Sequence, residues 1–196
     1  MTPRSISHGL ILATLVLLPA LAGCSTTPPP RLFTLAPQPA APAGQLARII
    51  SVKRVAIAKY LDRLQIVRYR DSYELSYSEF TLWGEGLGDM VTRVLVEDLS
   101  TRLPRSQVYA ASGPLTAATP DITVEVNIDR FDTDPGGTVV LAAQWIAHRQ
   151  GKSDQIRSER IEVAPASGDA TGQVAAMSDT LGQFAGRIAT GLSAAP

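Results

Sequence analysis

The most distinctive chemistry in the sequence lies at residues 21–24, where Leu-Ala-Gly precedes the cysteine at position 24. This order matches a lipobox, in which a peptidase needs small residues and an acylating enzyme needs a thiol to alkylate. Cys24 is the only cysteine in the chain, so it has no disulfide partner within it. We therefore predict that Cys24 is lipidated and becomes the first residue of the mature protein.

Residues 1–23 have the pattern of a secretory signal peptide. Arg4 supplies positive charge near the start, and an almost unbroken apolar run extends from Gly9 to Ala22. A transmembrane anchor is the alternative, but this run is only about 14 residues long and contains Pro19, whereas crossing a bilayer needs about 20. Because a single acyl chain binds a membrane only marginally, we expect Cys24 to carry several.

The segment after Cys24 predicts where the protein is sorted and how it is held there. Ser25 stands where inner-membrane lipoproteins of the envelope carry an Asp retention signal, so we expect the periplasmic face of the outer membrane. Residues 25–30 read Ser-Thr-Thr-Pro-Pro-Pro, which favours extended polyproline II over a packed structure. We expect residues 24–31 to be a tether and residues 32–196 to be a single folded domain.

The remaining candidates for chemistry do not form a recognisable catalytic or metal site. His8 falls in the signal peptide, and His148 has no cysteine or Gly-x-Ser-x-Gly nucleophile to serve. The glycines of residues 84–88 lack the spacing of a phosphate-binding loop. The aspartates of residues 129–134 lack that of a calcium loop. The sequence therefore predicts no enzymatic activity, no catalytic residue, no cofactor and no metal site.

Charge excludes further classes of function. The chain carries 18 basic and 18 acidic residues, with a formal net charge of zero. Nucleic-acid binding and polybasic membrane patches both need an excess of positive charge. We therefore expect no nucleic-acid partner, and we expect membrane attachment through the lipid anchor.

Hydrophobic periodicity predicts the elements of the domain. Helices with one apolar stripe are expected at residues 86–102 and 174–192. Strands are expected at residues 32–35, 48–58, 65–70, 73–77, 107–110, 122–131, 139–146 and 156–163. Turns are expected at residues 60–63 and 134–137, and a loop at 37–44. Hairpins outnumber crossover units, so we predict an α+β fold: an antiparallel or mixed sheet with two helices packed on one face, after the signal peptide and the Pro-rich tether.

Aromatic and charged residues near two predicted strand ends are candidates for binding a partner. Tyr60, Leu61 and Arg63 share the turn at residues 60–63, and Trp83 ends the strand region before the first helix. An aromatic or aliphatic anchor beside charged residues is typical of protein interfaces. We predict that these four residues bind a partner, although aromatic residues also commonly fill cores.

Several short motifs occur in an order that resembles a known family. They are the lipobox, Phe-Thr-Leu at 33–35, the stretches at 55–63 and 83–87, Arg93 to Leu103, and Asp-Arg-Phe at 129–131. Together they resemble the PqiC family of ABC-type transport auxiliary lipoproteins over nearly the whole mature chain. The family often has proline where this chain has Ala58, and Trp-Ala-Glu-Pro-Leu where it has Trp-Gly-Glu-Gly-Leu at 83–87.

The resemblance implies a function without catalysis. It implies a lipoprotein of the outer membrane that works with an MCE-domain periplasmic protein and inner-membrane transporter components. Such a lipoprotein docks the far end of a lipid conduit at its membrane and supports membrane integrity. The alternative is a lipoprotein regulator of a cell-wall synthase or another envelope complex. A homo-oligomer is compatible with either function.

We predict that membrane anchoring depends on the sulfur of Cys24, because the sequence offers no second membrane-binding segment after cleavage. Cys24→Ala should block lipidation and leave uncleaved precursor at the inner membrane. Membrane fractionation and gel mobility measure both effects. Normal outer-membrane fractionation of this variant would contradict the lipobox prediction.

Overall fold

The computed structural model describes residues 29–111 and 119–194, so Cys24, Ser25 and the signal peptide lie outside the described residues. The elements follow one another as β1 (Arg31–Phe33), β2 (Ile49–Val52), β3 (Ala56–Ile57), a 3-10 turn η2 (Lys59–Leu61), β4 (Gln65–Tyr69), β5 (Leu75–Trp83), α2 (Leu87–Arg102), β6 (Gln107–Ala110), β7 (Ile122–Thr133), β8 (Val139–Arg149), β9 (Gln155–Val163) and α3 (Ala170–Ala194).

Strand β7 is the centre of the sheet, because strands pair along both of its edges. On one edge, β8 runs antiparallel to β7 over almost its whole length, and β9 continues the sheet beyond β8. On the other edge, β2, β3 and β4 pair with β7 one after another, all in the parallel direction. The segment from β2 to β4 therefore runs along β7 as one broken strand.

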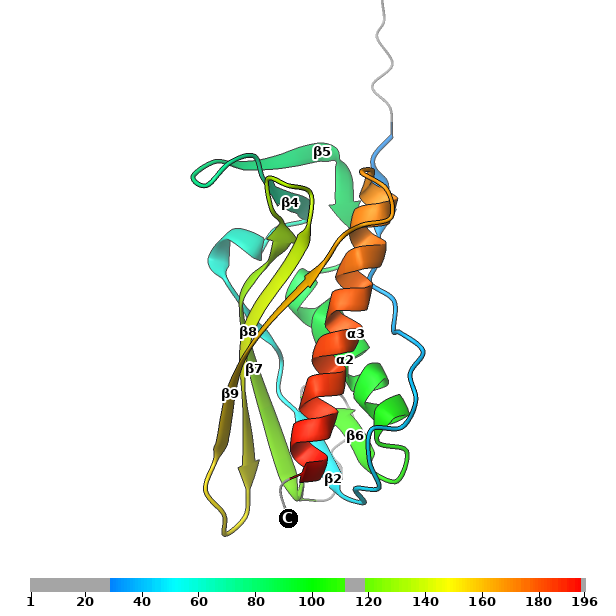
Figure 1. Cartoon of the computed structure of the whole chain (residues 1–196), viewed down its shortest axis with the longest axis vertical. Coiled ribbons are helices and arrows are strands. Elements are labelled where there is room, and N and C mark those ends of the chain that lie inside the picture. The colour runs from blue at the N-terminus through cyan, green and yellow to red at the C-terminus, as the bar shows by residue number, and fades with distance from the viewer. Residues whose placement is uncertain (1–28, 112–118, 195–196) are drawn as a thin grey trace, which may run out of the picture.

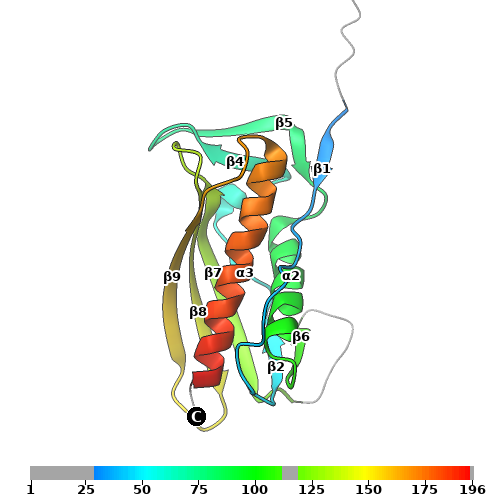
Figure 2. The ribbon, with the colours of Figure 1, turned by 45° about the vertical axis from the view of Figure 1, so that its right-hand side comes forward.

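The sheet extends beyond this centre at both ends of the molecule. At one end, β6 pairs with β2. At the other end, β4 pairs with β5, and β5 pairs with β1 through residues 81–83. Figures 1 and 2 show β4 and β5 crossing the end of the molecule at which the described chain begins. The sheet is therefore mixed, and both ends of the long axis carry strands.

Both helices lie side by side on one face of the sheet (Figures 1 and 2). Their apolar stripes, with Leu95 and Leu99 on α2 and Phe184 and Ile188 on α3, are fully buried. The strands supply the opposite wall of the same core, including Phe131 and Trp145. The α+β fold with two helices on one face of a mixed sheet is confirmed.

One predicted strand, at residues 48–58, is divided in two. Between β2 and β3, the backbone N–H of Val55 turns away from β7 and donates a hydrogen bond to the Thr92 hydroxyl of α2, at 2.9 Å. The Val55 side chain is fully buried at this point. The alternating pattern predicted a strand, but the break depends on a contact with a helix that follows 30 or more residues later.

The predicted turn at residues 134–137 is confirmed. The Asp134 carboxylate accepts the backbone N–H of Thr138 at 2.8 Å, and Gly137 has a φ of +89°. A positive φ is accessible to glycine at little steric cost. These two residues set the register of the β7–β8 hairpin.

Helix α3 approaches the sheet closely at Gly191, so a methyl group added there should lower the stability of the fold. A Cβ atom added to Gly191 would lie 2.8 Å from Cη2 of the fully buried Trp145 ring. Overpacking of this kind costs about 1–3 kcal/mol, which exceeds the gain of about 1 kcal/mol from Gly→Ala in a helix. We expect Gly191→Ala to lower the melting temperature of the purified protein by several degrees.

Gly186 on the same helix is the matched control. A Cβ atom there would meet its nearest neighbour, Nε of Arg102, at an ordinary 3.6 Å. Gly186→Ala should therefore raise the melting temperature slightly, because only the helix propensity changes. Equal shifts in both variants would show that the contact with Trp145 does not limit the packing of α3.

Candidate functional site

The turn predicted at residues 60–63 is present and lies between β3 and β4. Residues 59–61 form the 3-10 turn η2, and Lys59 pairs with Asp62 at 2.9 Å. Arg63 is exposed, and its guanidinium lies over the Tyr77 ring of β5, 4.8 Å from the ring centroid. We refer to residues 59–63 as the docking turn. Its reachable surface is charged, with one aromatic residue partly exposed.

Tyr60 is tied to the sheet by its hydroxyl group. The hydroxyl donates a 2.6 Å hydrogen bond to Oδ2 of Asp132, and Nε of Arg130 donates to Oδ1 of the same carboxylate at 2.9 Å. The Arg130 guanidinium also lies over the Tyr69 ring, which packs edge-on against the Tyr60 ring. Tyr60 therefore holds the docking turn against the end of β7.

Burial controls the protonation of this cluster. The Asp132 carboxylate is fully buried, and burial raises its pKa, although the bonds from Tyr60 and Arg130 act in the opposite direction. Burial, followed by the hydrogen bond to Asp132, raises the pKa of Tyr60 far above its ordinary value. The tyrosine hydroxyl thus stays a hydrogen-bond donor at any physiological pH, and it keeps the carboxylate satisfied.

Two of the four predicted partner-binding residues lie in the core. The side chains of Leu61 and Trp83 are each only 2% exposed. The backbone N–H of Trp83 donates to the carbonyl of Leu64 at 2.6 Å, so the end of β5 is tied to the residue that follows the docking turn. Leu61 and Trp83 support the turn from the core, whereas Tyr60 and Arg63 contribute to its surface.

His148 lies on the face of the sheet opposite the helices. Its ring nitrogens lie 3.2 Å from Glu125 and 2.9 Å from Asp154, and Glu125 also pairs with Lys53. The pKa of Glu125 is lowered mainly by the Lys53 ammonium and to a smaller extent by His148. This cluster is an exposed network of polar side chains, in which Lys53 and Glu125 form an ion pair.

The three aspartates at 129, 132 and 134 point to different partners and do not converge. Asp129 accepts from Asn127, Asp132 is held by Tyr60 and Arg130, and Asp134 caps its own turn. Among residues 29–111 and 119–194, no group of three or more histidine, cysteine or acidic side chains is arranged to hold a metal ion.

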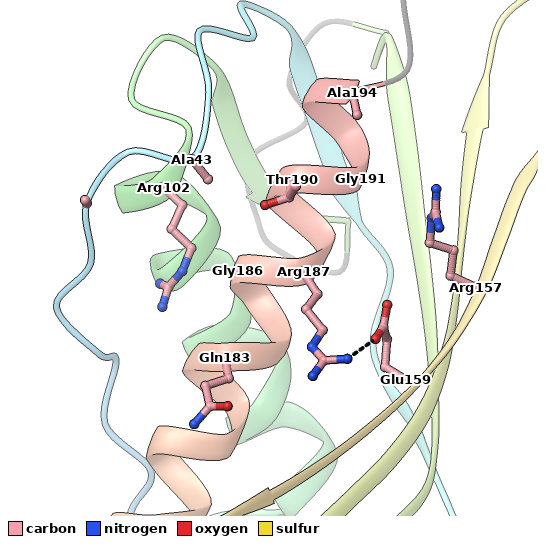
Figure 3. Close-up of a pocket in the computed structure, with 11 residues that line it drawn as sticks. Ala43, Arg102, Arg157, Glu159, Gln183, Gly186, Arg187, Thr190, Gly191 and Ala194 are labelled. Carbon is pink, nitrogen blue, oxygen red and sulfur yellow. Dashed lines mark hydrogen bonds and ion pairs between the residues drawn. The ribbon is translucent and has the colours of Figure 1, made fainter.

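A groove that the sequence did not predict runs beside α3. Its volume is about 710 Å³, and Figure 3 shows it between α3, β9 and the segment at residues 36–46. Small residues such as Ala43 and Gly186 line its floor, and Arg102, Arg157 and Arg187 line its walls. Its carboxylate, Glu159, is already paired with Arg187 at 2.7 Å. Arg102 is in turn paired with Asp98, so carboxylates neutralise two of the three arginines of the groove.

The segment at residues 36–46, which we call the strap, is held by buried polar groups of both helices. The backbone N–H of Gln38 donates to Oδ1 of Asp98 at 2.9 Å, and that of Ala43 donates to the Arg102 carbonyl at 2.8 Å. The backbone N–H of Ala36 donates to the Ser178 hydroxyl of α3 at 3.2 Å. The strap therefore crosses both helices.

Asp98 and Arg102 form the buried ion pair on which the strap depends, with a distance of 3.0 Å. Burial raises the pKa of Asp98, against the opposing effects of Gln38 and Arg102. A sequence signal for this pair existed, since both residues fall on the apolar stripe of α2. A charged residue on a buried helix face is expected only where it has a partner.

No helix in the described residues is both long enough and apolar enough to cross a bilayer.

The chain resembles curated relatives over part of its length. It is 29% identical over 110 residues to the intermembrane transport lipoprotein PqiC of Escherichia coli, and equally to that of Shigella flexneri. The aligned region covers 56% of this chain and 57% of each relative, so it spans little more than half of their length.

Two solved structures share the fold. One, of an uncharacterized protein, superposes with a TM-score of 0.72 at 23% identity, covering 85% of this chain and 100% of the other. A protein from Xanthomonas campestris superposes with a TM-score of 0.66 at 16% identity, covering 83% and 95%. Residues 32–189 match the family described as the ABC-type transport auxiliary lipoprotein component, which confirms the resemblance of the sequence motifs. The chain belongs to this family of transport auxiliary lipoproteins.

Proposed function

We propose that this lipoprotein docks the periplasmic conduit of an MCE-type lipid transport system at the outer membrane and thereby supports membrane integrity. The observation that carries the proposal is the family match over residues 32–189. The relatives named intermembrane transport lipoprotein support it. In this proposal Cys24 carries the lipid anchor, Ser25 permits sorting to the outer membrane, and the domain binds an MCE-domain protein that connects to the inner-membrane transporter.

The docking turn is the surface we propose for that protein contact. The hydrogen bond from Tyr60 to Asp132 and the stacking of Arg63 on Tyr77 hold the turn in one conformation. A surface that is ordered before binding loses less conformational entropy when a partner arrives. Leu61 and Trp83 contribute indirectly, because they support the turn from the core.

Arg63 is a cleaner probe of this surface than Tyr60. Tyr60→Ala would leave the Asp132 carboxylate buried without its hydroxyl donor, which costs about 1–3 kcal/mol or more for a charged group. Loss of binding in that variant would therefore mix docking with folding. The Arg63 side chain is exposed and lies over the ring of Tyr77, itself half exposed, so its charge can be reversed with little effect on the core.

We predict that Arg63→Glu weakens binding of the purified full-length lipoprotein to the periplasmic part of its MCE-domain partner about tenfold or more, as expected for a charge reversal at an interface. Surface-immobilised binding measurements at fixed salt would give the ratio of dissociation constants. The melting temperature should stay within about 2 °C, because exposed substitutions rarely change stability by more than about 0.5 kcal/mol.

Arg105→Glu is the matched control, since Arg105 is an exposed arginine in the loop between α2 and β6 at the other end of the molecule. It should bind like the unchanged protein. Equal binding by both variants would show that the docking turn is not the contact surface. A protein that ignores MCE domains but stimulates a cell-wall synthase would overturn the transport proposal itself.

A further inference from the structure

Exposed apolar side chains gather at the end of the molecule where the tether enters. Six large hydrophobic side chains are exposed in the described part of the chain, and five of them lie on β1, on the β4–β5 hairpin or directly before β4: Leu32, Leu64, Tyr73, Tyr77 and Phe80. The sixth, Ile156, lies on β9 near the opposite end. Single exposed hydrophobic residues need no explanation, but a cluster at one end does.

The tip of the β4–β5 hairpin is an ordered turn that presents an aromatic residue to solvent. The Asp71 carboxylate accepts the backbone N–H groups of Tyr73 and Glu74 at 2.7 and 2.9 Å, and Arg70 pairs with Glu74 at 2.9 Å. The Tyr73 side chain is nevertheless 97% exposed. The turn uses only the backbone of Tyr73, so the tyrosine side chain is free to contact a surface outside the protein.

The length of the tether indicates that the surface contacted by this end of the molecule is the membrane. Seven residue steps separate Cys24 from Arg31, the first residue of β1, and a fully extended chain spans at most about 3.6 Å per residue, or about 25 Å. Helix α3 has 25 residues, which corresponds to about 38 Å, and it runs along the long axis in Figures 1 and 2. The tether is thus shorter than the domain, so the β1 end stays within about 25 Å of the membrane that holds the anchor.

We propose that residues 70–80 with Leu32, here called the membrane arm, rest in the headgroup region of the bilayer that holds the lipid anchor. Tyrosine side chains favour this region, because the ring contacts acyl chains while the hydroxyl meets water. Leu32 and Phe80 add apolar surface of the kind that interfacial segments bury. The inference rests on the lipid anchor of the proposed function. Tyr77, which carries Arg63 on its ring, marks the boundary between the membrane arm and the docking turn.

The charge of the membrane arm specifies the kind of lipid surface. Arg70 is outnumbered by Asp71, Glu74 and Glu79, so residues 70–80 carry an excess of negative charge. Acidic side chains are repelled by anionic headgroups. The membrane arm therefore fits a zwitterionic headgroup surface, and added anionic lipid should not strengthen the contact.

The test uses the full lipidated protein reconstituted into phosphatidylethanolamine–phosphatidylcholine vesicles. Lipidation consumes Cys24, the only cysteine of the chain, so a Tyr73→Cys variant can carry a single polarity-sensitive dye. Ile156→Cys is the matched control, because it also replaces an exposed hydrophobic residue, at the opposite end. Nitroxide lipids should quench the dye at position 73 at least about twofold more than the dye at position 156, as expected for an interfacial site.

Each other outcome overturns the inference in a distinguishable way. If the protein floats with the vesicles and both dyes are equally unquenched, the membrane arm does not touch the bilayer, although the anchor of the proposed function survives. If the protein does not float, the anchor fails as well. Stronger quenching on addition of anionic lipid would contradict the zwitterionic surface. A concentration-dependent shift of the dye at position 73 without lipid would assign the membrane arm to a second copy of the chain.

Discussion

The double pairing of β7 is the constraint on which the rest of the structure depends. A strand of this length buries many backbone N–H and C=O groups, and each must find a partner. Strand β8 satisfies one edge continuously, whereas β2, β3 and β4 divide the other edge among them. The docking turn exists because the chain must leave β7 after β3 and return to it at β4. Its position is therefore a consequence of sheet pairing.

Local patterns predicted the elements well, and contacts between distant residues explain what they missed. The first helix and the β7–β8 hairpin follow from periodicity and turn chemistry within one segment. The strap depends on Asp98 and Arg102, which follow it by more than 50 residues, so its own Pro- and Ala-rich composition indicated only a loop. Residue type likewise placed Trp83 at an interface, but aromatic residues serve cores and interfaces alike, and only the tertiary structure distinguishes them.

Buried polar groups give this domain its rigid surfaces. The Tyr60–Asp132–Arg130 cluster fixes the docking turn, and the Asp98–Arg102 pair fixes the strap. Charged partners of this kind are costly to separate once they are buried, so they strongly favour one arrangement of the segments they join. The exposed Arg63 of the docking turn and the open groove beside α3 therefore lie on segments with little freedom to rearrange.

The strap also determines when the domain can finish folding. Its hydrogen bond from Ala36 to Ser178 joins the first described segment of the chain to the last helix. The N-terminal end of the chain is synthesised first, so the strap is present while α3 is still to come. Until α3 arrives, the apolar face of the sheet that it covers stays open, with Trp145 unprotected. The incomplete chain should therefore need a holding chaperone during this interval, and a truncation that removes α3 should aggregate.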